Sequence, residues 1–210
     1  MTRRTYLQAA ETTVALLTDP AVGAAWQEPS ALPEFGVGGL AGHLAKQVLH
    51  VAEILAGDVP DREPVSLLDH YTGARWVGVP VDDEVSVHVR RGGETVAADG
   101  QAALARRVRA EVDRLATVLP AEPADRRVYL PWAGWSLTLD DFLVTRLLEI
   151  AVHCDDLAVS VGVEMPPLPS AVLDPVLALL LRLSVHRHGP TAVLRALSRA
   201  GRAPATIAAI

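Results

Sequence analysis

Apolar residues recur along this chain at spacings of three and four residues, the period of a helix with one buried face. Four long stretches follow this pattern: residues 5–18, 37–57, 101–119 and 138–161. In the second stretch, the apolar face consists of Val37, Leu40, Leu44, Val48, Val51 and Leu55. Four long amphipathic helices without a convincing strand predict an all-α protein, an antiparallel four-helix bundle.

The segments between these helices are less regular. Residues 26–36 and 120–131 contain several prolines and are predicted to be loops, and residues 66–76 are predicted to form a short helix. Residues 85–89 place three valines in alternation, as in a strand, but no second alternating run offers a partner. Because an isolated strand is not stable, helix or irregular structure is favoured there.

A proline-rich segment marks the best boundary in the chain. Gly162 ends the fourth long helix, and Pro166, Pro167 and Pro169 follow it. We therefore expect a bundle over residues 1–162. Residues 163–210 are expected to be a short helical C-terminal extension with two helices, over residues 172–187 and 190–200.

Composition narrows the classes of function. The 210 residues carry a formal net charge of −6, which argues against general nucleic-acid binding. No apolar run approaches the ~20 residues of a membrane span, and the N-terminus lacks the apolar core of a signal peptide. These features predict a cytoplasmic protein without nucleic-acid or membrane partners, and they are compatible with a homodimer.

The fourth long helix carries the candidate chemistry. Most of its sides are apolar, yet Arg146, Glu149, His153 and Asp156 follow one another at steps of three, four and three residues and so form one polar stripe. Ionisable groups on a buried helix are costly unless they are paired or bind a metal. Glu149 and His153 are four residues apart, so both can reach one ion, and their donor atoms suit zinc or a related metal.

Two questions stay open on spacing alone. A third ligand should come from a facing helix, and either His43 or His50 could supply it, but they lie about 10 Å apart along the axis. The stripe could instead consist of ion pairs, Glu149 with Arg146 and His153 with Asp156. An E-x-x-x-H spacing on a helix does not by itself separate these alternatives.

Two segments resemble a known family. One is the Gly-His-Leu-Ala run at residues 42–45, and the other is the R-x-x-E-x-x-x-H-x-x-D pattern of residues 146–156. Together they are similar to the DinB-like superfamily, specifically the N-terminal domain of mycothiol-dependent maleylpyruvate isomerase, over about residues 5–162. The resemblance implies a four-helix bundle with a His–Glu–His site for a divalent metal, usually zinc. The ligands it implies are His43, Glu149 and His153.

The resemblance also implies an activity. We expect a metal-dependent enzyme in which a low-molecular-weight thiol, such as mycothiol, attacks a small electrophile, with isomerisation or S-transfer as the result. Either Arg146 or an arginine of the C-terminal extension would hold a substrate carboxylate, and Asp156 would orient His153 or act on the metal site from behind the ligands. The arginine-rich composition fits the actinobacterial setting in which mycothiol occurs. The alternative is a non-catalytic metal-binding helical domain that serves ligand binding or assembly.

Several other residues have plainer expected roles. Cys154 points into the apolar face and is expected to be a core residue, while His70 and His88 are expected at the surface. The glycines of residues 36–41 are expected to be a flexible start of a helix, since no strand precedes them. Two histidine ligands with ordinary pKa values near ~6.5 would predict metal loss below about pH 6, with up to two protons taken up.

Overall fold

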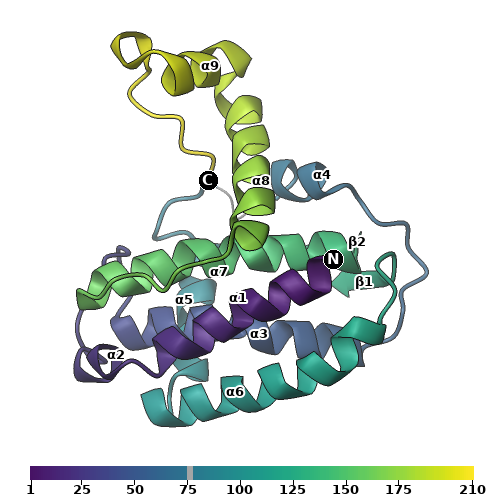
Figure 1. Cartoon of the computed structure of the whole chain (residues 1–210), viewed down its shortest axis with the longest axis vertical. Helices are drawn as coiled ribbons and strands as arrows, with labels where there is room; N and C mark the ends of the chain where they lie inside the picture. Colours follow the sequence, from purple (N-terminus) through teal and green to yellow (C-terminus); the bar gives the residue numbers. More distant parts are fainter. Residues whose placement is uncertain (75–77) are drawn as a thin grey trace.

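The computed structural model describes residues 1–74 and 78–210 (Figure 1). Its helices are α1 (Thr2–Leu17), α2 (Pro20–Ala24), α3 (Val37–Ala56), α4 (Leu67–Thr72), α5 (Glu84–Val96), α6 (Gln101–Val118), α7 (Leu139–Val161), α8 (Ser170–His188) and α9 (Pro190–Ser198). Two strands, β1 (Arg127–Leu130) and β2 (Trp135–Thr138), and two short 3₁₀ turns complete it. Among the described residues, no helix is both long enough and apolar enough to span a membrane.

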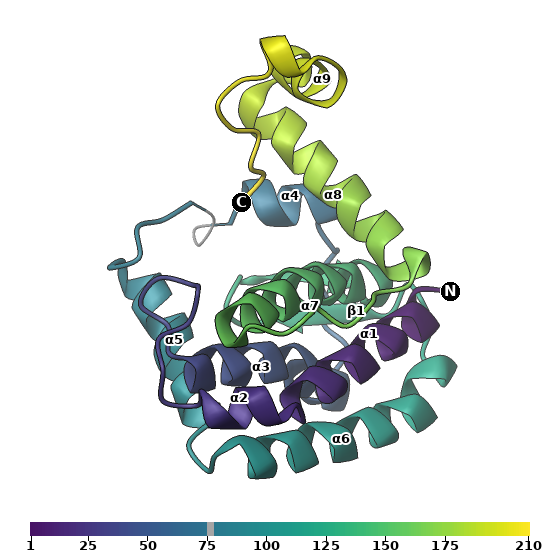
Figure 2. The same ribbon diagram turned by 60° about the vertical axis from the view of Figure 1, so that its left-hand side comes forward.

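The four long amphipathic stretches form a helical bundle, as predicted. Helices α1, α3, α6 and α7 enclose one core, in which α7 and α6 each contact both α1 and α3 (Figure 2). The predicted apolar positions are the buried ones: Leu40, Leu44, Val48 and Val51 of α3 are fully buried. The bundle therefore follows directly from the spacing of apolar residues in each helix.

Some neighbouring helices of the bundle are antiparallel, and one neighbouring pair is parallel. Helices α3 and α7 are antiparallel, and so are α1 and α6, where Gln101 at the start of α6 donates a hydrogen bond to the Leu17 carbonyl at the end of α1. Helices α1 and α7 run in the same direction, since Arg3 and Asp140, both in first turns, form an ion pair. Long connections between these helices permit parallel neighbours, which short loops would not.

A short hairpin replaces part of the predicted loop over residues 120–131. Strand β1 pairs antiparallel with β2, with Val128 opposite Leu137 and Leu130 opposite Trp135. Val128, Leu130 and Leu137 are buried. Four-residue strands offer too few alternating positions to be recognised in the sequence. The hairpin exists because its apolar side packs on α3 and α7.

The segment between α3 and α6 contains two helices, α4 and α5. Helix α4 begins after Ser66, whose side chain accepts a hydrogen bond from the Asp69 amide, and it ends at Thr72; the last two residues of the predicted helix, 75 and 76, lie outside the described residues. Residues 85–89 lie in α5 and not in a strand. The helical alternative favoured by the sequence is thus confirmed.

Glycines bring α5 into backbone contact with α3. A Cβ on Gly42 would lie 2.0 Å from the Gly93 carbonyl oxygen, and a Cβ on Gly93 would lie 2.4 Å from the Gly39 carbonyl oxygen. Gly39, Gly42 and Gly93 lie within helices and form a close-packed crossing next to His43. The helix start expected at residues 36–41 is confirmed, since Gly36 is the N-cap residue of α3.

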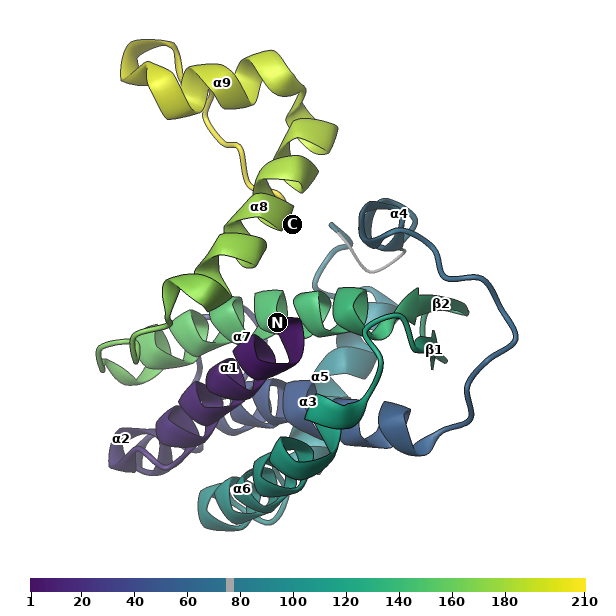
Figure 3. The same ribbon diagram turned by 45° about the vertical axis from the view of Figure 1, so that its right-hand side comes forward.

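The C-terminal helices leave the bundle. Helix α8 starts against α7, α1 and α4 and then projects away, and α9 crosses its far end (Figure 3). The chain then returns beside α8, where Ser184 donates a hydrogen bond to the Ile207 carbonyl. Both helices were predicted, and the range predicted for α8, residues 172–187, is slightly shorter than the observed one.

Candidate metal centre

Two antiparallel helices place the candidate ligands opposite one another. The N-terminus of helix α7 is capped by Thr138, whose hydroxyl accepts a hydrogen bond from the Asp141 amide at 3.1 Å. Its polar stripe then faces α3, which presents His43 level with Glu149 and His153. Of the two histidines that spacing left open, His43 is therefore the one beside Glu149 and His153, whereas His50 lies further along α3 and stacks on the Trp132 ring with 5.3 Å between centroids.

The three side chains have the spacing of ligands around one ion. Nε2 of His43 lies 3.5 Å from Oε2 of Glu149, and Nε2 of His153 lies 3.4 Å from the same oxygen. One donor atom from each residue lies within 4.8 Å of the others. Ligands about 2.1 Å from a tetrahedral zinc ion are separated by about 3.4 Å. These residues could therefore hold a divalent metal.

Burial and hydrogen bonding shift the pKa values of the three candidate ligands in different directions. Burial alone would raise the pKa of Glu149, but hydrogen bonds to His153 and His43 hold it well below its usual value. Burial lowers the pKa of His43, and its buried Nδ1 has no hydrogen-bond partner among the described residues. Although burial also disfavours charge on His153, Asp156 and Glu149 raise its pKa to about 9. At neutral pH, the protein without metal thus holds His153 protonated against an ionised Glu149.

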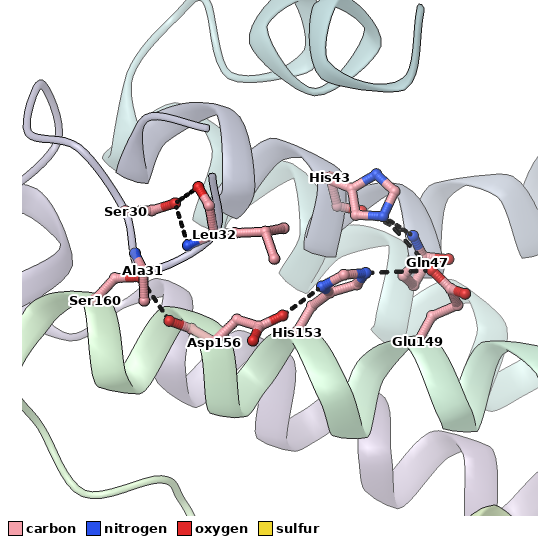
Figure 4. A network of polar contacts seen from close by, with 9 residues as sticks. All are labelled: Ser30, Ala31, Leu32, His43, Gln47, Glu149, His153, Asp156 and Ser160. Carbon is pink, nitrogen blue, oxygen red and sulfur yellow. Dashed lines mark hydrogen bonds and ion pairs between the residues drawn. The ribbon is translucent and has the colours of Figure 1, made fainter. Parts of the chain in front are cut away.

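Asp156 orients His153 from the side away from Glu149. Its Oδ2 lies 2.9 Å from His153 Nδ1, and because a carboxylate accepts, the proton is on Nδ1 and Nε2 is left to face the cluster (Figure 4). The next turn of α7 is tied to the loop before α3: Ser160 donates to the Asp156 carbonyl and accepts from the Ala31 amide. The role expected of Asp156 is supported by this geometry.

Arg146 lies beside the cluster without forming the ion pair considered from the sequence. Arg146 is buried, with 8 % of its surface exposed, and its Nη1 donates a hydrogen bond to Gln47 Oε1 at 2.6 Å. Within residues 1–74 and 78–210, no carboxylate makes an ion pair with it. The amide of Gln47 also donates to the His43 carbonyl, so it links the arginine to a candidate ligand.

Gln47 is the site residue that sequence reasoning missed. It is a buried polar side chain, 2 % exposed, one turn after His43 on the same helix. Its backbone carbonyl accepts a hydrogen bond from the Tyr6 hydroxyl, which connects α3 to α1. A polar residue four positions after a ligand was visible in the sequence, but its partner, Arg146, is 99 residues away.

The structure confirms the expectations for Cys154 and His88 but not the one for His70. Cys154 is fully buried in the core, and burial raises its pKa to about 12, so it is not a nucleophile at neutral pH. His88 is exposed, as expected. His70 was expected at the surface and is instead 2 % exposed, because α4 folds onto the bundle and Trp135 donates a hydrogen bond to its Nδ1. Burial lowers the pKa of His70 to about 4.

The cluster can be reached from solvent. The side chains of His43, His153 and Glu149 keep 13 %, 15 % and 24 % of their surface exposed. A closed structural metal site would bury its ligands more fully, whereas a catalytic site needs an open coordination position. Two surface hollows of about 630 Å³ each lie elsewhere, beside Pro60 and Asp61.

Comparison with known families identifies the bundle. The family model described as the mycothiol maleylpyruvate isomerase N-terminal domain matches residues 6–158. The match includes both helices of the cluster and ends before α8. Searches of curated proteins and of solved structures found no match.

Proposed function

Because the chain belongs to the mycothiol maleylpyruvate isomerase N-terminal domain family, we propose that it is a metal-dependent, thiol-dependent isomerase or S-transferase. The observation that carries the proposal is the partly exposed cluster of His43, Glu149 and His153, with Nε2 of both histidines about one ligand-to-ligand distance from the same carboxylate oxygen. Two imidazoles and one carboxylate suit Zn²⁺.

A divalent metal bound there would supply a positive charge that stabilises the thiolate of a low-molecular-weight thiol such as mycothiol. The protein supports this chemistry with fixed groups. Asp156 keeps the Nδ1 proton of His153 in place, so that Nε2 is available to the metal. The hydrogen bonds of Gln47 with Arg146 and with Tyr6 tie α3 to α7 and to α1, which positions His43 along α7.

Arg146 is the group proposed to bind the substrate. A buried guanidinium without a carboxylate partner is costly, and an incoming carboxylate would make up the missing pair. Its hydrogen bond to Gln47 and its position over the Phe142 ring, 5.3 Å from the centroid, restrict its orientation. The substrate class is therefore a small electrophile that carries a carboxylate.

The reaction consists of addition and elimination. The thiolate sulfur forms a bond to an electrophilic carbon of the substrate double bond, and the π electron pair moves onto the rest of the substrate. After rotation about the resulting single bond, the same electron pair re-forms the double bond and the C–S bond breaks. The net result is isomerisation with the thiol regenerated; if the C–S bond persists and the substrate takes up a proton, the result is S-transfer.

Metal analysis combined with a thiol assay tests the proposal. Purified protein should contain about one divalent metal per chain. Only when metal-loaded, it should accelerate the thiol-dependent conversion of maleylpyruvate or a related unsaturated carboxylate to its isomer or to a thiol adduct. His153→Ala should lose both metal and rate, whereas the matched control His50→Ala should keep both. Metal retention in His153→Ala would refute the ligand assignment. A metal-loaded protein that converts none of a panel of electrophiles in the presence of thiol would support the non-catalytic alternative.

A further inference from the structure

The C-terminal arm, which we define as α8 and α9 with the turn after them (residues 170–202), has an unusual surface. Helix α8 is apolar on almost every side, and only one side is covered: Val172, Val176, Leu179 and Leu183 are buried. On another side, Leu177 is 58 % exposed and Leu181, one turn later, is 44 % exposed. A helix that is apolar all round is normally buried on all sides.

Helix α9 also exposes apolar side chains. Val193 packs inward at 2 % exposure, but Leu194 and Leu197, on adjacent turns, are 66 % and 67 % exposed. Single exposed leucines are common on protein surfaces, whereas four on two consecutive helices that project from the body mark an interaction site (Figure 3).

Charge separates the arm from the bundle. Residues 163–210 contain five arginines and two acidic residues, a formal charge of +3, while residues 1–162 contain 23 acidic and 14 basic residues, a formal charge of −9. The arginines of the arm form no ion pair within the described parts of the chain. The arm is therefore a basic and apolar surface, which would be complementary to an acidic partner surface.

We propose that the arm of one copy packs on the acidic bundle of a second copy, so that the protein is a dimer that exchanges its arms. The bundle supplies the opposite charge, whereas two arms placed face to face would bring like charges together. Each copy has one arm and one bundle, so a two-fold axis satisfies both contacts and closes the assembly. An anionic membrane is disfavoured as the partner because the bundle itself is strongly negative.

Sedimentation velocity of the full chain between 1 and 100 µM tests this proposal directly. We expect a dimer at 50 mM salt that weakens at 500 mM salt, because the contact joins opposite charges. Leu197→Asp should raise the dimer Kd by about 30-fold or more, as loss of a central apolar contact does. Ser198→Asp is the matched control: it adds the same charge at the next exposed position without removing apolar surface, so its effect should be several-fold smaller.

Charge reversal distinguishes the arrangement of the two copies. Arg195→Glu should weaken a dimer in which the arm meets the acidic bundle, but it should leave unchanged or strengthen one in which arms meet each other. A wild-type monomer at 100 µM, equal effects of Leu197→Asp and Ser198→Asp, or a dimer strengthened by Arg195→Glu would each overturn the proposal. So would a monomer that co-sediments with phosphatidylglycerol vesicles. Unchanged circular dichroism would show that the variants fold.

Discussion

Metal binding near neutral pH should release close to one proton per ion, and that proton should come from His153. With its pKa at about 9, His153 is almost fully protonated at pH 6.5, and the metal must displace that proton to use Nε2. Glu149 is already ionised, and burial keeps His43 largely neutral, so neither contributes a second proton. The pKa of His153 therefore governs how the metal affinity depends on pH.

The magnitude follows from the same pKa. Below the pKa of about 7 that zinc-bound water reaches, each pH unit should improve Kd about tenfold, which is about 1.4 kcal/mol per unit. Isothermal titration calorimetry in buffers of different ionisation enthalpy counts the released protons. At pH 6.5 the measurement lies below the pKa of about 7 that zinc-bound water reaches, so water adds little to the count.

Asp156→Asn provides the matched variant. The amide cannot stabilise a protonated His153 as the carboxylate does, so the pKa of His153 should fall towards its ordinary value and fewer protons should be released at pH 7. The affinity at pH 8.5 should fall by about 10-fold to 100-fold because His153 loses its orienting partner. Release of two protons or none from the wild-type protein at pH 6.5, or an unchanged count in the variant, would refute this reasoning.

Three further predictions concern stability. Burial lowers the pKa of both His50 and His70 to about 4, so the folded state binds fewer protons than the unfolded state. The free energy of unfolding should therefore fall as the pH drops from 6.5 to 4, by up to ~3 kcal/mol per histidine. Urea unfolding with chelator present measures this, and equal stability at both pH values would contradict the prediction. Cys154→Ala should cost about 1 kcal/mol through a small cavity and leave the thiol assay unchanged, whereas a ~100-fold loss of rate with metal retained would show a catalytic role. Gly42→Ala should cost about 1–3 kcal/mol and weaken metal binding, because its Cβ would clash with Gly93. Gly57→Ala, whose Cβ would meet only the Ile54 carbonyl oxygen at 3.4 Å, should change stability by less than about 0.5 kcal/mol, and similar effects of the two substitutions would contradict the close crossing.

Local patterns explain what could be predicted from the sequence. The helical bundle follows from apolar spacing within each helix, a property that neighbouring residues carry by themselves. The polar stripe from Arg146 to Asp156 and the inward direction of Cys154 follow from the same helical geometry. The family resemblance, confirmed by the match over residues 6–158, added the choice of His43.

Contacts between distant segments decided the rest. Only the antiparallel packing of α3 on α7 brings His43, and not His50, to the carboxylate of Glu149, and only that packing pairs Arg146 with Gln47. The burial of His70 and the hairpin depend on chain segments that fold back onto the bundle. Ordinary pKa values predicted metal loss below about pH 6 with up to two protons taken up. The pKa of a buried group depends on its surroundings, however: Asp156 and Glu149 raise the pKa of His153, while desolvation lowers that of His43. The sequence by itself thus determined the helices and the candidate ligands, and the tertiary structure decided their partners and their charges.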